Sequence, residues 1–109
     1  MNKEEEVNIV IGGDIYPKGQ MESHFINGDA SKIFNDTLSI IENSDYTVVN
    51  LECPLVNSET PILKDGYNLR ADTRTTNGIK SSGINAVNLS NNHILDHGEQ
   101  GLKSTLKIL

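Results

Sequence analysis

The chain has 109 residues, of which 36% are hydrophobic, so it is long enough for one domain with one core. Its formal net charge of -6 argues against a surface for nucleic acid or anionic membranes, and its single cysteine excludes an internal disulfide bond. No apolar run approaches the roughly 20 residues that span a bilayer, and the charged residues 1–6 lack the apolar core of a signal peptide, so a soluble domain is expected.

The first predicted strand is the short β-branched run at residues 7–12. Gly12, Gly13 and Asp14 come at its carboxyl end, where the glycines allow a sharp turn. Sites in open α/β sheets form at this end of the strands, which makes Asp14 a candidate site residue. A plain turn or cap role also explains a Gly-Asp pair.

The next two segments predict packing rather than chemistry. Residues 16–28 contain Pro17 and Gly19 in their first half and Asn27-Gly28 at their end. This composition predicts a loop with His24 on the surface. Residues 30–43 predict a helix, capped by Asp29 or Ser31, with its apolar side chains on one face.

The second predicted strand spans residues 46–51. Glu52 lies just past its end, as Asp14 lies just past the first strand, and Pro54 ends the ladder. Cys53 has no second cysteine to support a metal or redox role, so we expect a small buried residue there.

The polar stretch from residue 56 to residue 72 is long for a compact domain, and such loops are functional or contain a hairpin. A short strand is expected at residues 67–70, where Arg70 is interpreted as a solvated charge. Residues 75–82 then predict a short helix that ends at Gly83.

The third predicted strand, residues 84–90, leads into the most informative stretch of the chain. Asn91, Asn92 and His93 have no packing reason to be adjacent. An amide oxygen can coordinate a divalent cation, and a neighbouring imidazole can bind metal or transfer a proton. A final helix is predicted at residues 99–109.

The alternation of strands and helices predicts an α/β fold, a parallel βαβαβ segment with right-handed crossovers. In this arrangement Asp14, Glu52 and the Asn92-His93 pair emerge at the same edge of the sheet. The alternative is a plain α/β domain in which residues 91–93 merely cap a turn.

Three motifs together resemble the CapA family: residues 13–15, residues 50–55 and residues 90–102. That family is named for poly-gamma-glutamate capsule biosynthesis and belongs to the calcineurin-like metallophosphoesterase superfamily. The resemblance implies an αββα sandwich with a metal site at the strand ends, of which residues 1–109 are the N-terminal portion. It also implies association with the bacterial cell envelope.

The resemblance implies Asp14, Glu52 and Asn92 as metal ligands and His93 as the catalytic histidine that faces the leaving group. It also points to Asp96 as a catalytic residue, which we expect either to orient His93 or to cap amides of the following helix. Manganese, iron or zinc would suit such mixed oxygen and nitrogen ligands. The metal would lower the pKa of a bound water while the histidine donates a proton.

All three motifs depart from the wider superfamily. Tyr16 stands at a histidine position of the first motif, and Ile94 stands where an acidic residue often follows the histidine of the third. The second motif is Asn50-Leu51-Glu52, where the superfamily has Gly-Asp-x-x-Asp/Glu. The expected function is capsule or poly-gamma-glutamate biosynthesis, with a metallophosphatase-type hydrolase site for a polymer or phosphoester substrate. The alternative is a non-catalytic binding or assembly component of polymer synthesis or export. Alone, the chain is expected to bind metal weakly, to catalyse poorly and to self-associate through uncovered apolar faces.

Overall fold

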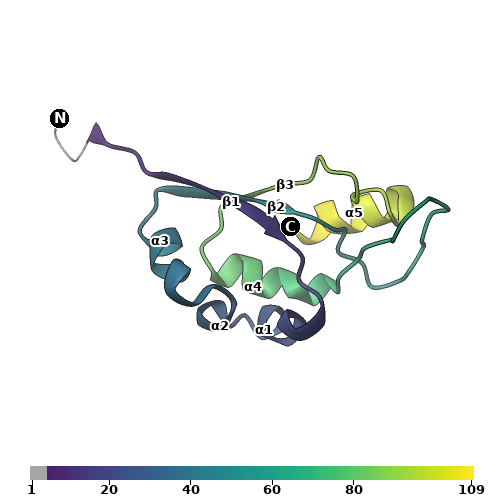
Figure 1. Cartoon of the computed structure of the whole chain (residues 1–109), viewed down its shortest axis with the longest axis horizontal. Coiled ribbons are helices and arrows are strands. Elements are labelled where there is room, and N and C mark those ends of the chain that lie inside the picture. Colours follow the sequence, from purple (N-terminus) through teal and green to yellow (C-terminus); the bar gives the residue numbers. More distant parts are fainter. Residues whose placement is uncertain (1–4) are drawn as a thin grey trace.

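The computed structural model describes residues 5–109 and contains a three-stranded parallel sheet (Figure 1). Strands β1 (Ile9–Ile15), β2 (Tyr46–Leu51) and β3 (Ala86–Asn88) lie in the order β1-β2-β3. Both neighbouring pairs are parallel, which confirms the predicted α/β arrangement. The carboxyl ends of the three strands therefore lie at one edge of the sheet.

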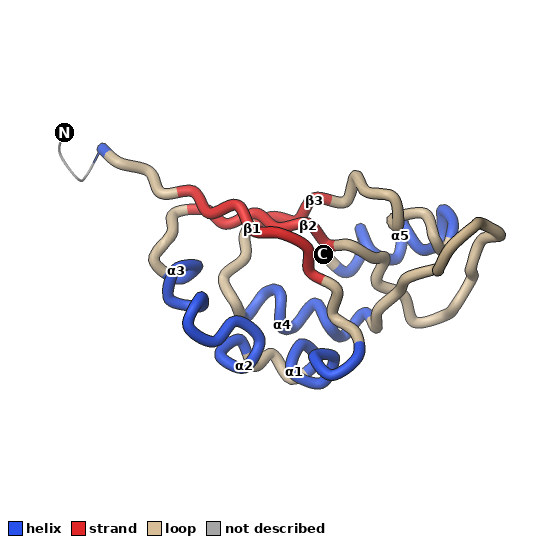
Figure 2. The backbone as a smooth tube through the Cα atoms, viewed as in Figure 1, coloured by secondary structure: helices blue, strands red, loops and turns tan. Residues whose placement is uncertain are grey.

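Helices connect the strands, and α1 to α4 lie on one side of the sheet (Figures 1 and 2). Their bounds are α1 Glu22–Ile26, α2 Ala30–Phe34, α3 Leu38–Glu42, α4 Thr76–Ser81 and α5 Gly98–Ile108, with 3-10 turns at Gly19–Met21, Asn35–Thr37 and Thr73–Thr75. Among residues 5–109, no helix combines the length and the apolar character needed to cross a bilayer.

The first strand differs from the prediction because its two glycines lie inside the strand and do not end it. Pairing with β2 slips in register between Ile11 and Asp14, which is the signature of a β-bulge. A Cβ on Gly12 would lie 2.8 Å from Cγ1 of Val49, so glycine permits the close approach of the two strands. Asp14 consequently lies within β1 and pairs with Asn50.

Two predictions about the β1–β2 connection were wrong. The single helix expected at residues 30–43 is interrupted at Asn35, which has a φ of 48°. Asparagine, aspartate and threonine at residues 35–37 favour local hydrogen bonds over a continuous helix, and Thr37 Oγ1 donates to the Phe34 carbonyl at 2.6 Å. The loop expected at residues 16–28 contains α1, whose Phe25 is buried in the core.

The second half of the chain follows the prediction more closely. Helices α4 and α5 confirm the two expected helices, and α4 is followed by Gly83 with a φ of 84°. The strand expected at residues 67–70 is absent from the structure; Ala71 instead makes an isolated parallel bridge with Leu55. Cys53 is fully buried, and this burial raises the pKa of its thiol to about 12. The thiol therefore stays protonated and unreactive, as expected of a residue that packs in the core.

The core lies between the sheet and the helices, where Val49 and Leu51 of β2 pack with Phe25 of α1 and Ile79 of α4. The opposite face of the sheet is open along the first half of the strands: Ile9, Ile11 and Tyr46 are 61%, 79% and 46% exposed. Parallel sheets usually have both faces covered. Self-association through this face stays a prediction.

Replacing Gly78 with alanine should destabilise the fold. A Cβ there would lie 2.7 Å from both the Phe25 Cα and the Ile33 Cδ1, so α4 would have to move away from α1. We expect Gly78→Ala to lower the free energy of unfolding by about 1–3 kcal/mol, measured by urea denaturation. Gly13→Ala is the control, because nothing lies within 4 Å of its Cβ position. Equal losses in the two variants would contradict this account of the α1–α4 contact.

Candidate active site at the carboxyl edge of the sheet

A row of hydrogen-bonded polar side chains crosses the three strands. The parallel register aligns Asp14 of β1 with Asn50 of β2 and Asn88 of β3. Asn50 donates through Nδ2 to Asp14 Oδ1 at 2.8 Å, and its Oδ1 accepts from Asn88 Nδ2 at 2.9 Å. The amide of Asn50 is therefore oriented by its neighbours on both sides.

Asn91 connects this row to the turn that follows β3. Its Nδ2 donates to Asn50 Oδ1 at 3.1 Å and to the Leu51 carbonyl at 2.8 Å. Its own Oδ1 accepts from the backbone N–H of His93 at 3.1 Å. The turn that carries His93 is thus tied to the end of β2 through a single side chain.

His93 and Asp96 form a close pair, with Nδ1 of the imidazole 2.6 Å from Oδ2 of the carboxylate. The Asp96 side chain is only 1% exposed, while that of His93 is 16% exposed. Asp96 was expected either to contact His93 or to cap the following helix, and in the structure it contacts His93. Helix α5 begins after His97 without a side-chain cap.

The charge of Asp96 is stabilised by hydrogen bonds from other segments. Oδ1 accepts from Lys64 Nζ and Oδ2 from the Leu69 N–H, each at 2.7 Å. Burial opposes ionisation, but the hydrogen bonds from Lys64, Leu69 and His93 outweigh it and keep the pKa of Asp96 below its ordinary value. The carboxylate can therefore remain ionised beside the imidazole.

The segment of residues 57–70 is fastened to the same turn by two further residues. The Thr60 N–H donates to His97 Nδ1 at 2.9 Å, the Thr60 hydroxyl to the His97 carbonyl at 2.7 Å, and the Ile62 N–H to the Asp96 carbonyl at 2.9 Å. His97 is buried, which lowers its pKa below the ordinary value of 6.5. Since Nδ1 accepts a hydrogen bond, the ring is neutral with its proton on Nε2.

The residues predicted as metal ligands are placed differently from one another. Asp14 is exposed and accepts a hydrogen bond from Asn50, and Asn92 is also exposed. Glu52 is half-buried after β2, where its N–H donates to the Ile15 carbonyl at 2.9 Å. Tyr16 is near it: burial, together with the charges of Cys53 and Glu52, raises the pKa of the Tyr16 phenol.

Within residues 5–109, no three side chains of the histidine, cysteine, aspartate and glutamate types converge closely enough to hold a metal ion. The ligand roles of Asp14, Glu52 and Asn92 stay predictions.

Sequence reasoning assigned no role to Asn50 or to Lys64. Asn50 could have been noticed as a polar residue inside an otherwise apolar strand. Lys64 carried no local signal, because its partner Asp96 is 32 positions away in the chain.

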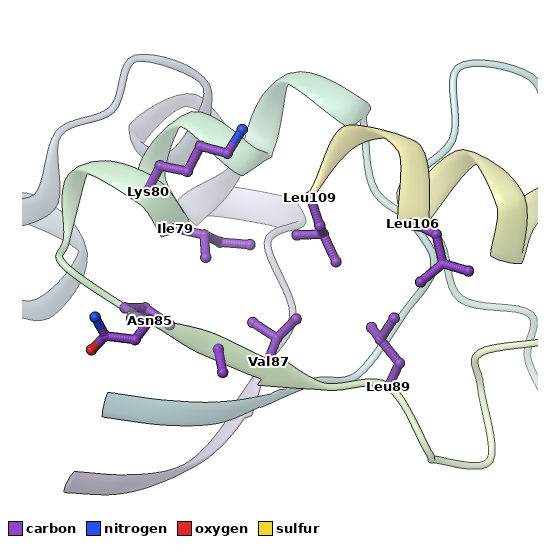
Figure 3. A pocket seen from close by; sticks show the side chains of 9 residues that line it. Ile79, Lys80, Asn85, Val87, Leu89, Leu106 and Leu109 are labelled. Atoms are coloured by element: carbon purple, nitrogen blue, oxygen red, sulfur yellow. The ribbon is translucent and has the colours of Figure 1, made fainter. Parts of the chain in front are cut away.

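A mainly apolar cavity lies elsewhere, away from these polar residues. A cavity of about 330 Å³ opens on the helix side of β3, between α4 and α5 (Figure 3). Its apolar lining comes from residues Ile79, Ile84, Val87, Leu89, Leu106 and Leu109. It contains none of the residues of the polar row or of the His93–Asp96 pair, so its position does not add to their chemistry.

The parallel sheet and the histidine–carboxylate pair at its carboxyl edge define an α/β domain with a candidate acid–base site. Residues 8–109 match the family model described as bacterial capsule synthesis protein PGA_cap, and the chain belongs to this family. This confirms the resemblance seen in the three sequence motifs.

Two curated relatives are similar to the chain over most of its length. It is 29% identical over 106 residues to "Capsule biosynthesis protein CapA" of Bacillus anthracis, which covers 94% of this chain and 26% of that protein. It is 30% identical over 95 residues to "PGA biosynthesis protein CapA" of Bacillus subtilis strain 168, which covers 86% of this chain and 25% of that protein. The chain thus spans about a quarter of the length of these relatives.

Acidification should loosen the segment of residues 57–70 through His97. The folded state keeps this ring neutral, while the unfolded chain takes up a proton near the ordinary pKa of 6.5. The stabilisation is therefore present above pH 6.5 and is lost as the pH falls toward the lowered folded-state pKa. We expect the hydrogen-exchange protection factor of the Thr60 N–H to fall between pH 7.5 and pH 5.5. His97→Gln should remove most of this pH dependence, and the control His24→Gln should keep it. Loss of the pH dependence in His24→Gln as well would contradict the assignment to His97.

Titration of the 109-residue chain with Mn²⁺ tests the incomplete ligand set. Because three acidic or imidazole ligands do not converge in the described residues, we expect no saturable stoichiometric binding by isothermal titration calorimetry. One-to-one binding that Asp14→Asn abolishes would show that the chain closes a metal site around Asp14 after all.

Proposed function

We propose that this chain is the CapA-like region of a capsule or poly-gamma-glutamate biosynthesis protein, and that the carboxyl edge of its sheet is a hydrolase site of the metallophosphoesterase type. Family membership and the names of the two relatives support the first part. The second part depends on one observation, the buried Asp96 carboxylate held 2.6 Å from Nδ1 of His93.

This pair suits proton transfer to a leaving oxygen. With Nδ1 directed at Asp96, Nε2 is the nitrogen left for a substrate, and the carboxylate stabilises the imidazolium form. In the proposed step, water attacks phosphorus, the bond to the leaving oxygen breaks, and protonated His93 gives its Nε2 proton to that oxygen. Asp96 keeps its charge throughout and acts by orienting the ring.

A non-catalytic role in binding or assembly is the second candidate. It is favoured by the open sheet face with exposed Ile9 and Ile11. Uncovered apolar area of this kind is typical of contact surfaces. A phosphoester hydrolysis assay separates the two candidates.

The assay uses the whole protein that carries this region, with an aryl phosphate and an alkyl phosphate as substrates. We expect His93→Ala to lower kcat by about 10²–10⁴, as loss of a general acid does, and Asp96→Asn to lower it less. The loss should be larger for the alkyl ester, because its poorer leaving group needs the proton more. His24→Ala is the control.

Equal sensitivity of the two esters to His93→Ala would show that the histidine does not act as the general acid. No hydrolysis of either ester by the wild-type protein would favour the binding or assembly role.

A further inference from the structure

Lys64 contacts the Asp96 carboxylate from a loop far away in sequence. Its Nζ lies 2.7 Å from Oδ1, with the lysine side chain 22% exposed and the aspartate side chain 1% exposed. The other oxygen, Oδ2, is shared by His93 Nδ1 and the Leu69 N–H. Both carboxylate oxygens are therefore held by residues of the 57–70 segment, and only one of them faces the imidazole.

This division of the two oxygens sets the direction of the carboxylate. An ionised carboxylate has about four lone-pair sites and can turn about its χ2 angle, which has broad preferences. Lys64 occupies Oδ1, and a buried charge is retained only where such partners remain. Without the ammonium group, Oδ1 would be buried without this donor. Rotation of the carboxylate toward another donor would then be favoured, and Oδ2 would move away from His93.

The loop itself is held mainly by polar contacts. Leu63 and Tyr67, on either side of Lys64 in the sequence, are 104% and 87% exposed, so burial of their side chains does not anchor it. Its described attachments to the turn after β3 are hydrogen bonds to Asp96 and His97. Lys64 is the one charged donor among these attachments in residues 5–109.

We propose that Lys64 is a positioning residue for His93, acting through Asp96. The ammonium group fixes Oδ1, which keeps Oδ2 directed at Nδ1 and so sets the direction of Nε2. The consequence for catalysis rests on the proposed function, in which His93 is the general acid. The positioning of His93 by Lys64 does not rest on the proposed function, so the positioning and its effect on catalysis can be tested separately.

The geometric part is tested in the 109-residue chain by proton NMR of the His93 Nδ1–H, assigned by its loss in His93→Gln. A proton held in a short hydrogen bond to a buried carboxylate is shielded from exchange with water and gives a resolved downfield signal. We expect the signal in wild type, in Lys64→Arg and in the control Lys103→Met, whose lysine is exposed on α5. In Lys64→Met the signal should broaden or disappear.

An unchanged signal in Lys64→Met would overturn the proposal, because Asp96 would then hold His93 without the ammonium group. Loss of the signal in Lys64→Arg as well as in Lys64→Met would also count against it, since arginine keeps the charge and the donors. Unfolding midpoints of all variants, measured in urea, show that each is folded under the conditions of the NMR measurement.

The catalytic part is tested in the whole protein with the same phosphate esters. Lys64→Met should lower kcat by about ten- to hundredfold, the cost of a misplaced catalytic group, and leave KM nearly unchanged, while Lys64→Arg restores most of the rate. A purely structural lysine would lower the unfolding midpoint but leave kcat unchanged at temperatures where the variant is folded. If the wild-type protein hydrolyses neither ester, the proposed function fails, and the NMR result still decides the positioning role.

Discussion

The arrangement of the site depends on one buried charge. The Asp96 carboxylate is almost completely removed from solvent, and an ion in that position costs several kcal/mol unless other groups compensate it. Compensation comes from Lys64, from the Leu69 N–H and from His93, which belong to two separate segments of the chain. Satisfying this charge therefore draws the 57–70 loop and the turn after β3 together.

The second constraint is the register of the parallel sheet. It places Asp14, Asn50 and Asn88 side by side, and the amide of Asn50 links the other two. Asn91 extends the link to the backbone of His93. The bulge at Gly12 and Gly13 is part of this geometry, because the register shift it introduces brings Asp14 opposite Asn50.

The sheet is covered by helices on one face (Figures 1 and 2). Ile9 and Ile11, on its other face, are 61% and 79% exposed. The curated relatives are about four times as long as the part that this chain matches. Both facts are compatible with a hydrolase site that needs further ligands and with a binding or assembly role. The His93–Asp96 pair favours the first, because orienting an imidazole with a buried carboxylate serves proton transfer.

By itself the sequence determined the three parallel strands, the helices near residues 75–82 and 99–109, and the burial of Cys53. Local patterns carry this information: apolar runs, turn residues and helix ends are encoded by neighbours in the chain. It also determined that Asp14 and His93 would lie toward the carboxyl edge of one sheet, because parallel strands leave no other choice. It did not reveal the break at Asn35, where local side-chain bonds compete with the helix.

Only the tertiary structure decided which polar groups meet. Lys64 and Asp96 are 32 positions apart, and Asn50 and Asn91 are 41 apart, so no local pattern could pair them. Asp96 had two equally reasonable partners in the sequence, an imidazole and a helix end. The folded chain directs it to His93 because burial leaves the carboxylate only those donors that the loop and the turn bring to it.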